Sequence, residues 1–365
     1  MEFNNVAILI TENCNARCKM CCDSRGVVCG KTLSEAELLH ILQDIKECTY
    51  VKHVGITGGE PLLYENLLDI IFNFDFEREV TISIKSNGFW GRDIGKTEEI
   101  IRKYQNKLSN ISLSYDEFHM QYIDVHSIKN IIHIAHKYRV PTDVVACSLK
   151  STLTPGDILN KLEESAYLTK FCYQPVICTG SGKLFEENDY IKLLDTQEDE
   201  IRCTAIVEPD ILINPRLEVY PCCSQVIENT ILKIGDLKEN KLNNVIMGIK
   251  HNYVFYTIFT EGFTPFIELL KQHKIDYPQK LASPCEFCEF LFKDNWFLEI
   301  LKKINYYEVL QGQEYSFESL ITTGLKSASA IKFGIAISPL RVSAIAQASE
   351  SSTVPAIQAN RQKIT

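Results

Sequence analysis

Four cysteines lie close together directly after the first apolar run, in the segment TENCNARCKMCCDSRG. Cys14, Cys18 and Cys21 follow the spacing C-x3-C-x2-C, and Cys22 adjoins the last of them. Thiols at this density form disulfides, bind a metal or react. Three thiolates on a short loop can hold three irons of a [4Fe-4S] cluster and leave the fourth iron open. A structural zinc loop, which needs a fourth ligand, remains the alternative on spacing alone.

An open iron can chelate the amino and carboxylate groups of S-adenosylmethionine, whose reductive cleavage gives a 5′-deoxyadenosyl radical. The cysteine spacing, joined to TGGEP at the end of the second predicted strand, resembles the radical S-adenosylmethionine superfamily. The aromatic residue usual before the last cysteine is replaced by Met20, which is still apolar. Glycines allow close backbone approach, and a carboxylate can accept from an ammonium. The resemblance implies that four residues help to bind the amino group of the cofactor: Gly58, Gly59, Glu60 and Pro61.

A second set of cysteines follows later in the chain: Cys203, then Cys222 and Cys223 in YPCCS, then Cys285 and Cys288 in PCEFC. A CxxC pair with two distant cysteines matches the ligand count of a second [4Fe-4S] cluster, and zinc held by four thiolates is the alternative. Five cysteines for four ligands leave one over. Adjacent residues of an extended segment point to opposite faces, so we expect one thiol of the CC pair to be free at the barrel mouth.

Further motifs extend the resemblance to a narrower family. SNGFWG, SYDEFH, DILINPRLEVYPCCS and CEFCEFLF resemble the radical epimerases that act on ribosomally made peptides, from the first strand to roughly Asn305. The resemblance implies that Cys223 returns a hydrogen atom to a peptide radical and that Asp210 is the family's acidic residue, although a turn-capping role for Asp210 is equally compatible with the sequence. It also implies an auxiliary [4Fe-4S] cluster held by Cys203, Cys222, Cys285 and Cys288.

The epimerase chemistry accounts for a spare thiol. Removal of a Cα hydrogen from an L-residue leaves a planar radical, and a hydrogen atom delivered to the opposite face gives the D-residue. The alternatives are a radical maturase that forms a thioether or another crosslink in a peptide, and a zinc-bound scaffold without catalysis. The resemblance implies two partners, a ribosomally synthesised precursor peptide and a one-electron reductant such as a flavodoxin or ferredoxin.

The elements that must position these motifs alternate between strand and helix. β-Branched runs predict six strands, and helical spacing of apolar residues predicts helices over 34–48, capped by Ser34, and 127–140, capped by Ser127. The strands are expected at Val6–Thr11, Val54–Thr57, Val80–Lys85, Ile111–Tyr115, Asp143–Ser148 and Phe171–Ile177. Such units predict an α/β fold, a partial (β/α)6 barrel of the TIM type with its active site at the carboxyl ends of the strands.

By that rule, the loops that contain the motifs are expected at the same end of the barrel. ENCNARC, TGGEP, SNGFWG, SYDEFH and CTGSGK each follow a predicted strand. Polar residues of the third and fourth loops are expected to contact the cofactor: Ser86, Asn87, Ser114 and Asp116. Asp116 with His119 could instead face the substrate or the ribose, and a plain turn explains SNG equally well.

The domain organisation is predicted in three parts. Residues 1–200 form the radical S-adenosylmethionine barrel, and 201–320 form a small cysteine-rich domain for the auxiliary cluster, with scattered cysteines and irregular loops over 202–293. Residues 321–365 form a Ser- and Ala-rich tail with a weak drive to fold.

Composition bounds the function. The chain has 365 residues, 45% of them hydrophobic, and a net charge of −9, so it offers nucleic acid no basic surface. It has no apolar run near the ~20 residues of a membrane span, and its first residues lack the features of a secretory signal. We therefore expect a cytoplasmic protein, where fourteen cysteines indicate metal binding or catalysis rather than disulfides.

Overall fold

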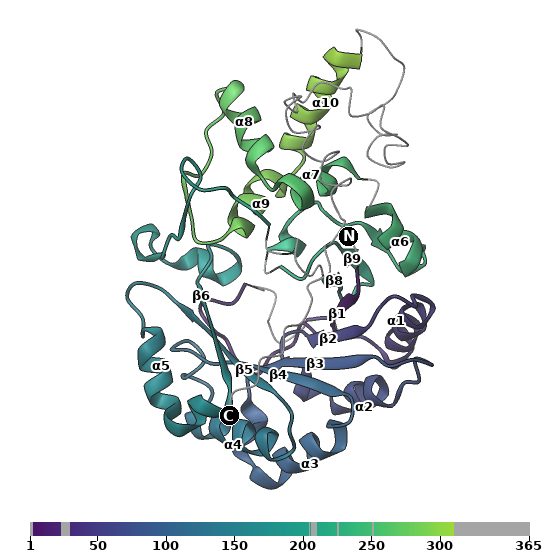
Figure 1. Cartoon of the computed structure of the whole chain (residues 1–365), viewed down its shortest axis with the longest axis vertical. Helices are drawn as coiled ribbons and strands as arrows, with labels where there is room; N and C mark the ends of the chain where they lie inside the picture. Colours follow the sequence, from purple (N-terminus) through teal and green to yellow (C-terminus); the bar gives the residue numbers. More distant parts are fainter. Residues whose placement is uncertain are drawn as a thin grey trace, which may run out of the picture.

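A computed structural model describes residues 3–22, 30–203, 205, 210–224, 226–249 and 252–309, without the side chains of 253 and 304–309. The predicted tail over 321–365 lies outside the described residues. The chain folds around one nine-stranded sheet with the strand order β10-β9-β8-β1-β2-β3-β4-β5-β6 (Figure 1). A further pair, β7 and β11, lies apart from it.

All six predicted strands are confirmed, with their ends shifted by three residues at most, and each pairs in parallel with its neighbour. Val, Ile and Leu dominate their inward positions, as is usual for parallel sheets covered on both faces. They are β1 (Asn5–Leu9), β2 (His53–Thr57), β3 (Thr81–Ser86), β4 (Leu108–Ser114), β5 (Thr142–Ser148) and β6 (Lys170–Pro175).

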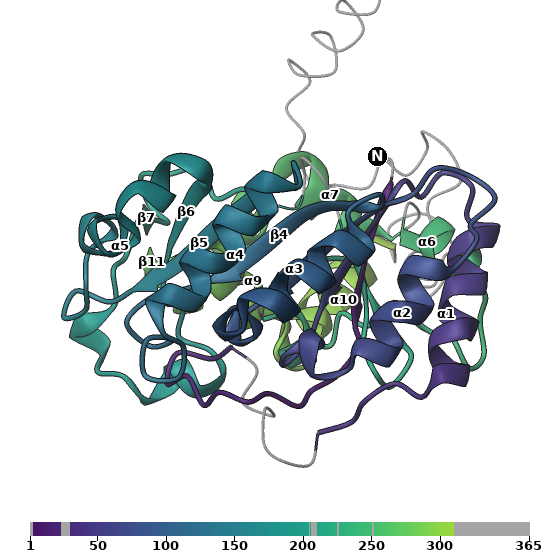
Figure 2. The ribbon, with the colours of Figure 1, turned by 90° about the horizontal axis from the view of Figure 1, so that it is seen from below.

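Five helices cover one face of these strands and lie side by side in Figure 2. Each buries an apolar stripe; α1 alone buries Leu38, Ile41, Leu42 and Ile45, each worth about 1.5–3 kcal/mol of transfer free energy. The five are α1 (Glu35–Glu47), α2 (Glu65–Asn73), α3 (Ile94–Tyr104), α4 (Val125–Lys137) and α5 (Pro155–Leu162). Short 3₁₀ helices occur in the connecting segments, namely η1 (Pro61–Leu63), η2 (Phe89–Arg92), η3 (Glu163–Leu168), η4 (Gly180–Leu184) and η5 (Glu187–Asp189).

The helix starts show which capping signals the chain uses. Ser34 caps α1 in a capping box with Glu37, as predicted. The prediction that Ser127 caps the fourth helix is wrong, because α4 begins two residues earlier behind Asp124, whose side chain accepts from the N–H of His126. An aspartate and a serine are both good caps, and the apolar spacing alone did not distinguish them.

Beyond residue 200 the structure is more regular than the sequence indicated. Instead of irregular loops, the chain adds three strands to the main sheet and five helices: β8 (Asp210–Ile213), β9 (Glu218–Tyr220), β10 (Gly235–Asp236), α6 (Leu242–Ile249), α7 (Tyr253–Glu261), α8 (Thr264–Gln272), α9 (Pro284–Phe292) and α10 (Trp296–Val309). Among the described residues, η7 (Ile227–Asn229) and β11 (Lys280–Leu281) also lie in this part, and β11 pairs with β7 (Leu194–Asp195) from just before residue 200. Strand β8 pairs in parallel with β1, so the sheet continues across the predicted boundary at 200, which stays a prediction.

Aromatic packing holds the C-terminal helices together. The rings of Phe266, Phe292 and Phe297 meet edge to face, with centroids 5.3–6.2 Å apart. Phe263 and Phe287 extend the cluster with centroids at 5.6 Å. Such pairs add about 0.5–1.5 kcal/mol each beyond area burial. The helix that carries the CEFC motif is therefore rigidly placed.

A buried carboxylate joins the two halves of the chain. Asp44, on α1, accepts from the backbone N–H of Leu242 at 3.1 Å and from the Lys241 ammonium at 2.8 Å. It thus caps the first turn of α6 from a helix about 200 residues away in sequence. Glu47 contacts the same ammonium at 3.4 Å from the surface.

Replacing Asp44 with alanine should therefore destabilise the fold by about 2 kcal/mol, since the buried N–H of Leu242 loses its acceptor. The matched variant Glu47→Ala, which removes only the exposed partner of Lys241, should change stability by less than about 0.5 kcal/mol. Urea denaturation of both variants would check this. Equal destabilisation by the two would show that Asp44 acts only as a surface ion-pair partner.

Candidate active site

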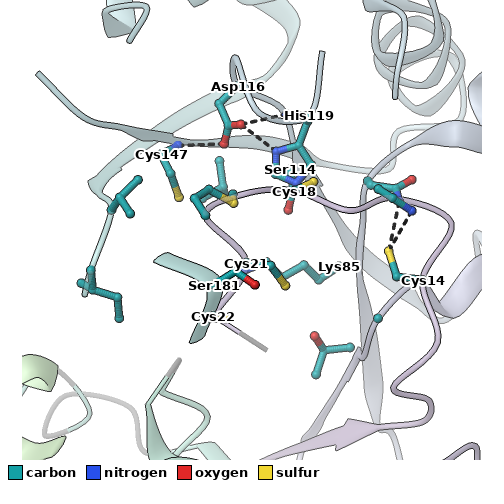
Figure 3. A pocket seen from close by; sticks show the side chains of 18 of the residues that line it. Cys14, Cys18, Cys21, Cys22, Lys85, Ser114, Asp116, His119, Cys147 and Ser181 are labelled. Carbon is teal, nitrogen blue, oxygen red and sulfur yellow. Dashed lines mark hydrogen bonds and ion pairs between the residues drawn. The ribbon is translucent and has the colours of Figure 1, made fainter. Parts of the chain in front are cut away.

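A cavity of about 500 Å³ opens at the carboxyl ends of the barrel strands. Its wall includes most of the residues predicted from the sequence, and Figure 3 shows its polar and sulfur-bearing side chains around the central space. The predicted residues that line it are Cys14, Cys18, Cys21, Gly58, Gly59, Ser86, Asn87, Ser114, Asp116 and Cys223. The strand-end rule thus brought together residues that lie up to 209 positions apart in the sequence.

Three of the lining thiols come from the loop after β1. Cys14, Cys18 and Cys21 are all partly buried, and burial raises the pKa of Cys14 above its ordinary value. Within the described residues, no three His, Cys, Asp or Glu side chains converge as a site for a single metal ion. A cubane distributes its ligands over separate irons, so thiols spread around one cavity fit a [4Fe-4S] cluster.

The cluster loop, residues 11–22, is held on one side by the TGGEP turn. Gly59 donates its N–H to the Thr11 carbonyl at 2.7 Å, and Glu60 donates to the Asn13 carbonyl at 2.8 Å. A Cβ on Gly59 would lie 2.1 Å from the Asn13 carbonyl oxygen, so only glycine fits. The close approach expected here toward the cofactor is, in the structure, an approach to the chain's own cluster loop.

A second glycine turn, in CTGSGK, holds the other end of the loop. Gly180 has a positive φ of 53°, and a Cβ there would lie 2.2 Å from the carbonyl oxygen of Cys22. The next residue, Ser181, donates its N–H to the Cys21 carbonyl at 2.9 Å. The cluster loop is therefore fixed through its backbone at both ends, which leaves its thiols directed toward the cavity.

Side chains reinforce this arrangement. The Arg216 guanidinium binds both oxygens of the buried Glu12 carboxylate, so the β8–β9 hairpin holds the start of the cluster loop. Asn13 donates to Tyr64 at 2.8 Å and to Thr32 at 3.0 Å. No sequence motif indicates these contacts, because the partners are distant in the chain.

Glu60 is fully buried and lies behind the cavity wall. Its carboxylate accepts from the N–H of Asn87 at 2.8 Å, from the Ser86 hydroxyl at 3.0 Å and from the N–H of Leu62 at 3.0 Å. Burial raises its pKa to about 7 against these hydrogen bonds. The contact expected from Glu60 to an ammonium stays a prediction; in the structure this carboxylate joins the second and third loops, and Pro61 starts η1 beside it.

Ser86 and Asn87 belong to the third loop, after β3. The Ser86 hydroxyl also accepts from the indole N–H of Trp90 at 3.1 Å, which fixes the SNGFW turn. The Asn87 amide donates to Asn15 at 2.8 Å and lies 3.8 Å from the Cys14 sulfur. Asn87 therefore contacts the cluster loop directly, whereas Ser86 lies one step behind it.

Asp116 and His119 form a buried pair at the end of β4, next to the lining residue Ser114 (Figure 3). The two side chains meet at 2.8 Å, and Asp116 also accepts from the N–H of Cys147 at 3.0 Å. Burial alone would lower the pKa of His119, but the hydrogen bonds to Asp116 and Cys18 outweigh it and raise the pKa to about 10. The pair thus presents an imidazolium to the cavity beside Cys18.

The β8–β9 hairpin brings the predicted donor thiol to the predicted acid. Leu212 pairs with Tyr220, so Asp210 comes to lie beside the CC pair, and the Cys223 thiol donates to its carboxylate at 3.3 Å. Burial and this carboxylate raise the pKa of Cys223 to about 12, although the Lys85 ammonium opposes them. Cys223 therefore keeps its S–H hydrogen at neutral pH while facing the cavity.

The other four cysteines of the second set lie outside the cavity wall. Cys203, Cys222 and Cys288 pack against the main core, and mutual charge interactions show that they lie near one another and near Cys285. Burial, the largest effect, raises the pKa of Cys203 to about 11 and those of Cys222 and Cys288 well above the ordinary value. Their assignment as auxiliary-cluster ligands stays a prediction, and adjacent thiols of the CC pair do take different surroundings.

Glu286, inside the CEFC motif, joins the helix of the second cysteine set to the loop that holds the first. Its carboxylate accepts from the N–H of Cys178 at 3.0 Å and from that of Ala282 at 2.8 Å, and it contacts the Lys192 ammonium at 3.3 Å. Cys178 immediately precedes the turn that contains Gly180. The sequence analysis missed this link, because a glutamate between two cysteines carries no signal of its own.

Two further lining residues escaped the sequence analysis as site residues. The charge of Lys85, on β3, lowers the pKa values of Cys147 and Cys223, whereas burial raises them. Cys147, on β5, is a second thiol on the same wall (Figure 3). The strand alternation could have indicated both, since each lies one or two residues from a strand end.

The fold and this site define a class. Residues 8–166 match the family model described as the radical SAM superfamily, so the chain carries a radical S-adenosylmethionine domain, which implies S-adenosylmethionine and a [4Fe-4S] cluster as cofactors. The chain is similar to the putative peptide biosynthesis protein YydG of Bacillus subtilis, with 27% identity over 315 residues that cover 84% of this chain and 96% of that protein. A probable GTP 3′,8-cyclase of Archaeoglobus fulgidus is 34% identical over 111 residues, 30% of this chain and 33% of that protein.

Solved structures agree on the fold. The chain superposes on native anSMEcpe with bound AdoMet at a TM-score of 0.52, with 13% identity over 79% of this chain and 96% of that one. Native anSMEcpe with bound AdoMet and Cp18Cys peptide gives a TM-score of 0.51, with 12% identity over 82% and 99% of the two chains. In the described part of the chain, no helix combines the length and apolar character that a membrane crossing requires.

Substituting alanine for Gly180 should disturb the first cluster site, because the new Cβ collides with the Cys22 carbonyl and strains a positive φ. We expect the loss of up to about four irons per chain from the anaerobically reconstituted protein. Gly156→Ala is the control, since its Cβ would meet only Thr154 at an ordinary 3.7 Å. Full iron content in Gly180→Ala would show that the cluster site does not depend on the close backbone contact between Gly180 and Cys22.

Proposed function

We propose that the protein inverts L-residues to D-residues in a ribosomally synthesised peptide. The single observation that carries the proposal is the Cys223 thiol, exposed to the cavity and hydrogen-bonded to Asp210 at 3.3 Å. The same cavity is lined by the three predicted ligands of the first cluster, Cys14, Cys18 and Cys21, and by Cys22. The similarity to a protein named for peptide biosynthesis, and to a fold solved elsewhere with a bound peptide, supports a peptide as substrate.

The first step needs an open-cornered cluster and a bound cofactor. Cys14, Cys18 and Cys21 would hold a [4Fe-4S] cluster, and with S-adenosylmethionine it supplies a carbon radical that removes a Cα hydrogen from the peptide. Asn87 fixes the loop beside Cys14. The two glycine turns keep the three thiols in place without adding side-chain bulk to the cavity.

The second step belongs to Cys223. The planar Cα radical takes the hydrogen atom of the Cys223 S–H group, so a C–H bond forms on the opposite face and a sulfur-centred radical remains. The raised pKa of Cys223 keeps that hydrogen in place at neutral pH, because burial and the Asp210 carboxylate disfavour the thiolate. The peptide itself is neither oxidised nor reduced.

Recovery of the thiol requires one electron and one proton. Cys222, the neighbour of Cys223, would be a ligand of an auxiliary [4Fe-4S] cluster with Cys203, Cys285 and Cys288, which places an electron source next to the sulfur radical. Asp210 lies within hydrogen-bond reach for returning the proton. With the electron used to open the cofactor, each turnover consumes two electrons, so the enzyme needs a one-electron reductant such as a flavodoxin or ferredoxin. Reduced thiols suit a cytoplasmic location.

Replacing Cys223 with alanine should abolish D-residue formation, by at least about 10²-fold, while deoxyadenosine still forms, because only the hydrogen donor is lost. Cys147→Ala is the matched control, since it removes another thiol of the same wall that does not contact Asp210. Chiral amino-acid analysis and chromatography of deoxyadenosine check both products.

Turnover in deuterated water separates inversion from crosslinking. Inversion adds one mass unit to the peptide, because the exchangeable thiol supplies the new hydrogen, whereas a thioether or other ring removes two hydrogens. D-residues made normally by Cys223→Ala would assign the donor elsewhere, and a ring product would replace epimerisation with crosslinking. A zinc-loaded protein that forms no deoxyadenosine would end both interpretations.

A further inference from the structure

One edge of the main sheet is formed by β6. Strand β6 is the last in the strand order and pairs only with β5 among the described strands. Val176 donates its N–H to the Ser148 carbonyl at 3.0 Å, so hydrogen bonds to β5 are made by residues 172, 174 and 176 in the alternation of parallel strands. Phe171 and Tyr173 consequently direct their N–H and C=O groups away from the sheet.

These outward groups are available for pairing. No backbone hydrogen bond from the described part of the chain reaches Phe171 or Tyr173 on that side. Pro175 shares this backbone orientation, but it is buried and lacks an N–H, so the row of donors ends there at the cavity. Soluble proteins usually cover or charge such an edge, because it is a ready template for another extended chain.

The edge leads directly into the active site. Gln174, Pro175, Val176 and Ile177 line the cavity that also contains Cys223. A chain paired beside Phe171 and Tyr173 would therefore bring a residue a few positions further along into the cavity, at about 3.3 Å per residue.

Large apolar side chains are exposed on β6 and on the segments before and after it. Tyr167, in η3 just before the strand, is 91% exposed, and Leu184, in η4 just after it, is 85% exposed. They are the two most exposed large apolar side chains of the described residues, and Tyr173 on the strand itself is 38% exposed. Leu184 also lines the cavity. Exposed apolar side chains at both ends of a free edge indicate an interaction surface.

We infer that the peptide substrate binds by adding an extended strand to the β6 edge, with apolar side chains of the peptide against Tyr167 and Leu184. The inference rests on the proposed function, which supplies a peptide that must be extended at the reacting residue. Main-chain pairing would hold the peptide, and its register on Phe171 and Tyr173 would select the residue that enters the cavity. A second copy of the chain on this edge would instead occupy the approach to the cavity.

Backbone hydrogen exchange with residue-level fragmentation tests the inference on the cluster-loaded enzyme. The probe is a synthetic peptide that is selected for binding to the enzyme from a library of short linear sequences. We expect the amides of Phe171 and Tyr173 to exchange at least about tenfold more slowly with the peptide, while those of Cys172 and Gln174, already bonded to β5, stay unchanged. N-methylation of successive peptide residues should weaken binding at alternate positions only.

A variant gives an independent readout. Tyr173→Pro removes the outward N–H and should weaken peptide binding about fivefold, whereas Tyr173→Phe keeps it and should bind normally. Neither substitution should change deoxyadenosine formation without peptide.

The outcomes separate the two proposals. If the peptide protects the amides of Phe171 and Tyr173 but no D-residues form, peptide pairing with the β6 edge is supported and epimerisation is rejected. If D-residues form but the amides of Phe171 and Tyr173 are not protected, peptide pairing with β6 is rejected and epimerisation is kept. The same conclusion follows if N-methylation weakens binding at positions that do not alternate. Protection of both amides before peptide is added, in a dimer, would assign the edge to a second copy and overturn the inference.

Discussion

The backbone of the cluster loop is fixed at two points where no side chain fits, and the candidate site depends on this constraint. Gly59 meets the loop near Asn13, and Gly180 meets it at Cys22, each so closely that a Cβ would overlap a carbonyl group. A loop held only by its side chains would be free to spread its three thiols in the absence of a cluster. Backbone contacts at both ends oppose that spreading and leave the sulfur side of the loop open.

The backbone contact at Gly180 also connects the first cysteine set to the second. The turn at Gly180 follows Cys178, whose N–H donates a hydrogen bond to the Glu286 carboxylate at 3.0 Å. Glu286 lies between Cys285 and Cys288 of the second cysteine set. A short chain of backbone contacts therefore runs from α9 to the carbonyls of Cys21 and Cys22. Arg216 makes a comparable link from the β8–β9 hairpin to Glu12. The two cysteine sets are thus parts of one rigid frame, although the sequence separates them by about 180 residues.

The features that could be predicted from the sequence are those that have a local sequence signal. Strand periods and the rule that active sites lie at carboxyl ends were enough to bring Cys14, Ser86 and Asp116 to one cavity. The alternation of an extended segment separated the surroundings of Cys222 and Cys223. The rest depended on pairings without a local signal. Strand β8 was not recognised as a neighbour of β1, since a four-residue run can join any edge. The hydrogen bonds that Glu60 accepts from Ser86 and Asn87 were not foreseen either, because both donors are distant in sequence.

Under the proposed epimerisation, the position of β8 beside β1 would allow one cavity to serve two faces of the same carbon atom. The cluster loop follows β1, whereas Cys223 follows β9, and β8 lies between these strands. Two strand spacings separate β1 from β9 by about 10 Å. A peptide residue between the two segments could lose its hydrogen toward one side and receive another from the other side. The proposed inversion therefore uses a donor thiol that is carried by a different strand from the cluster loop.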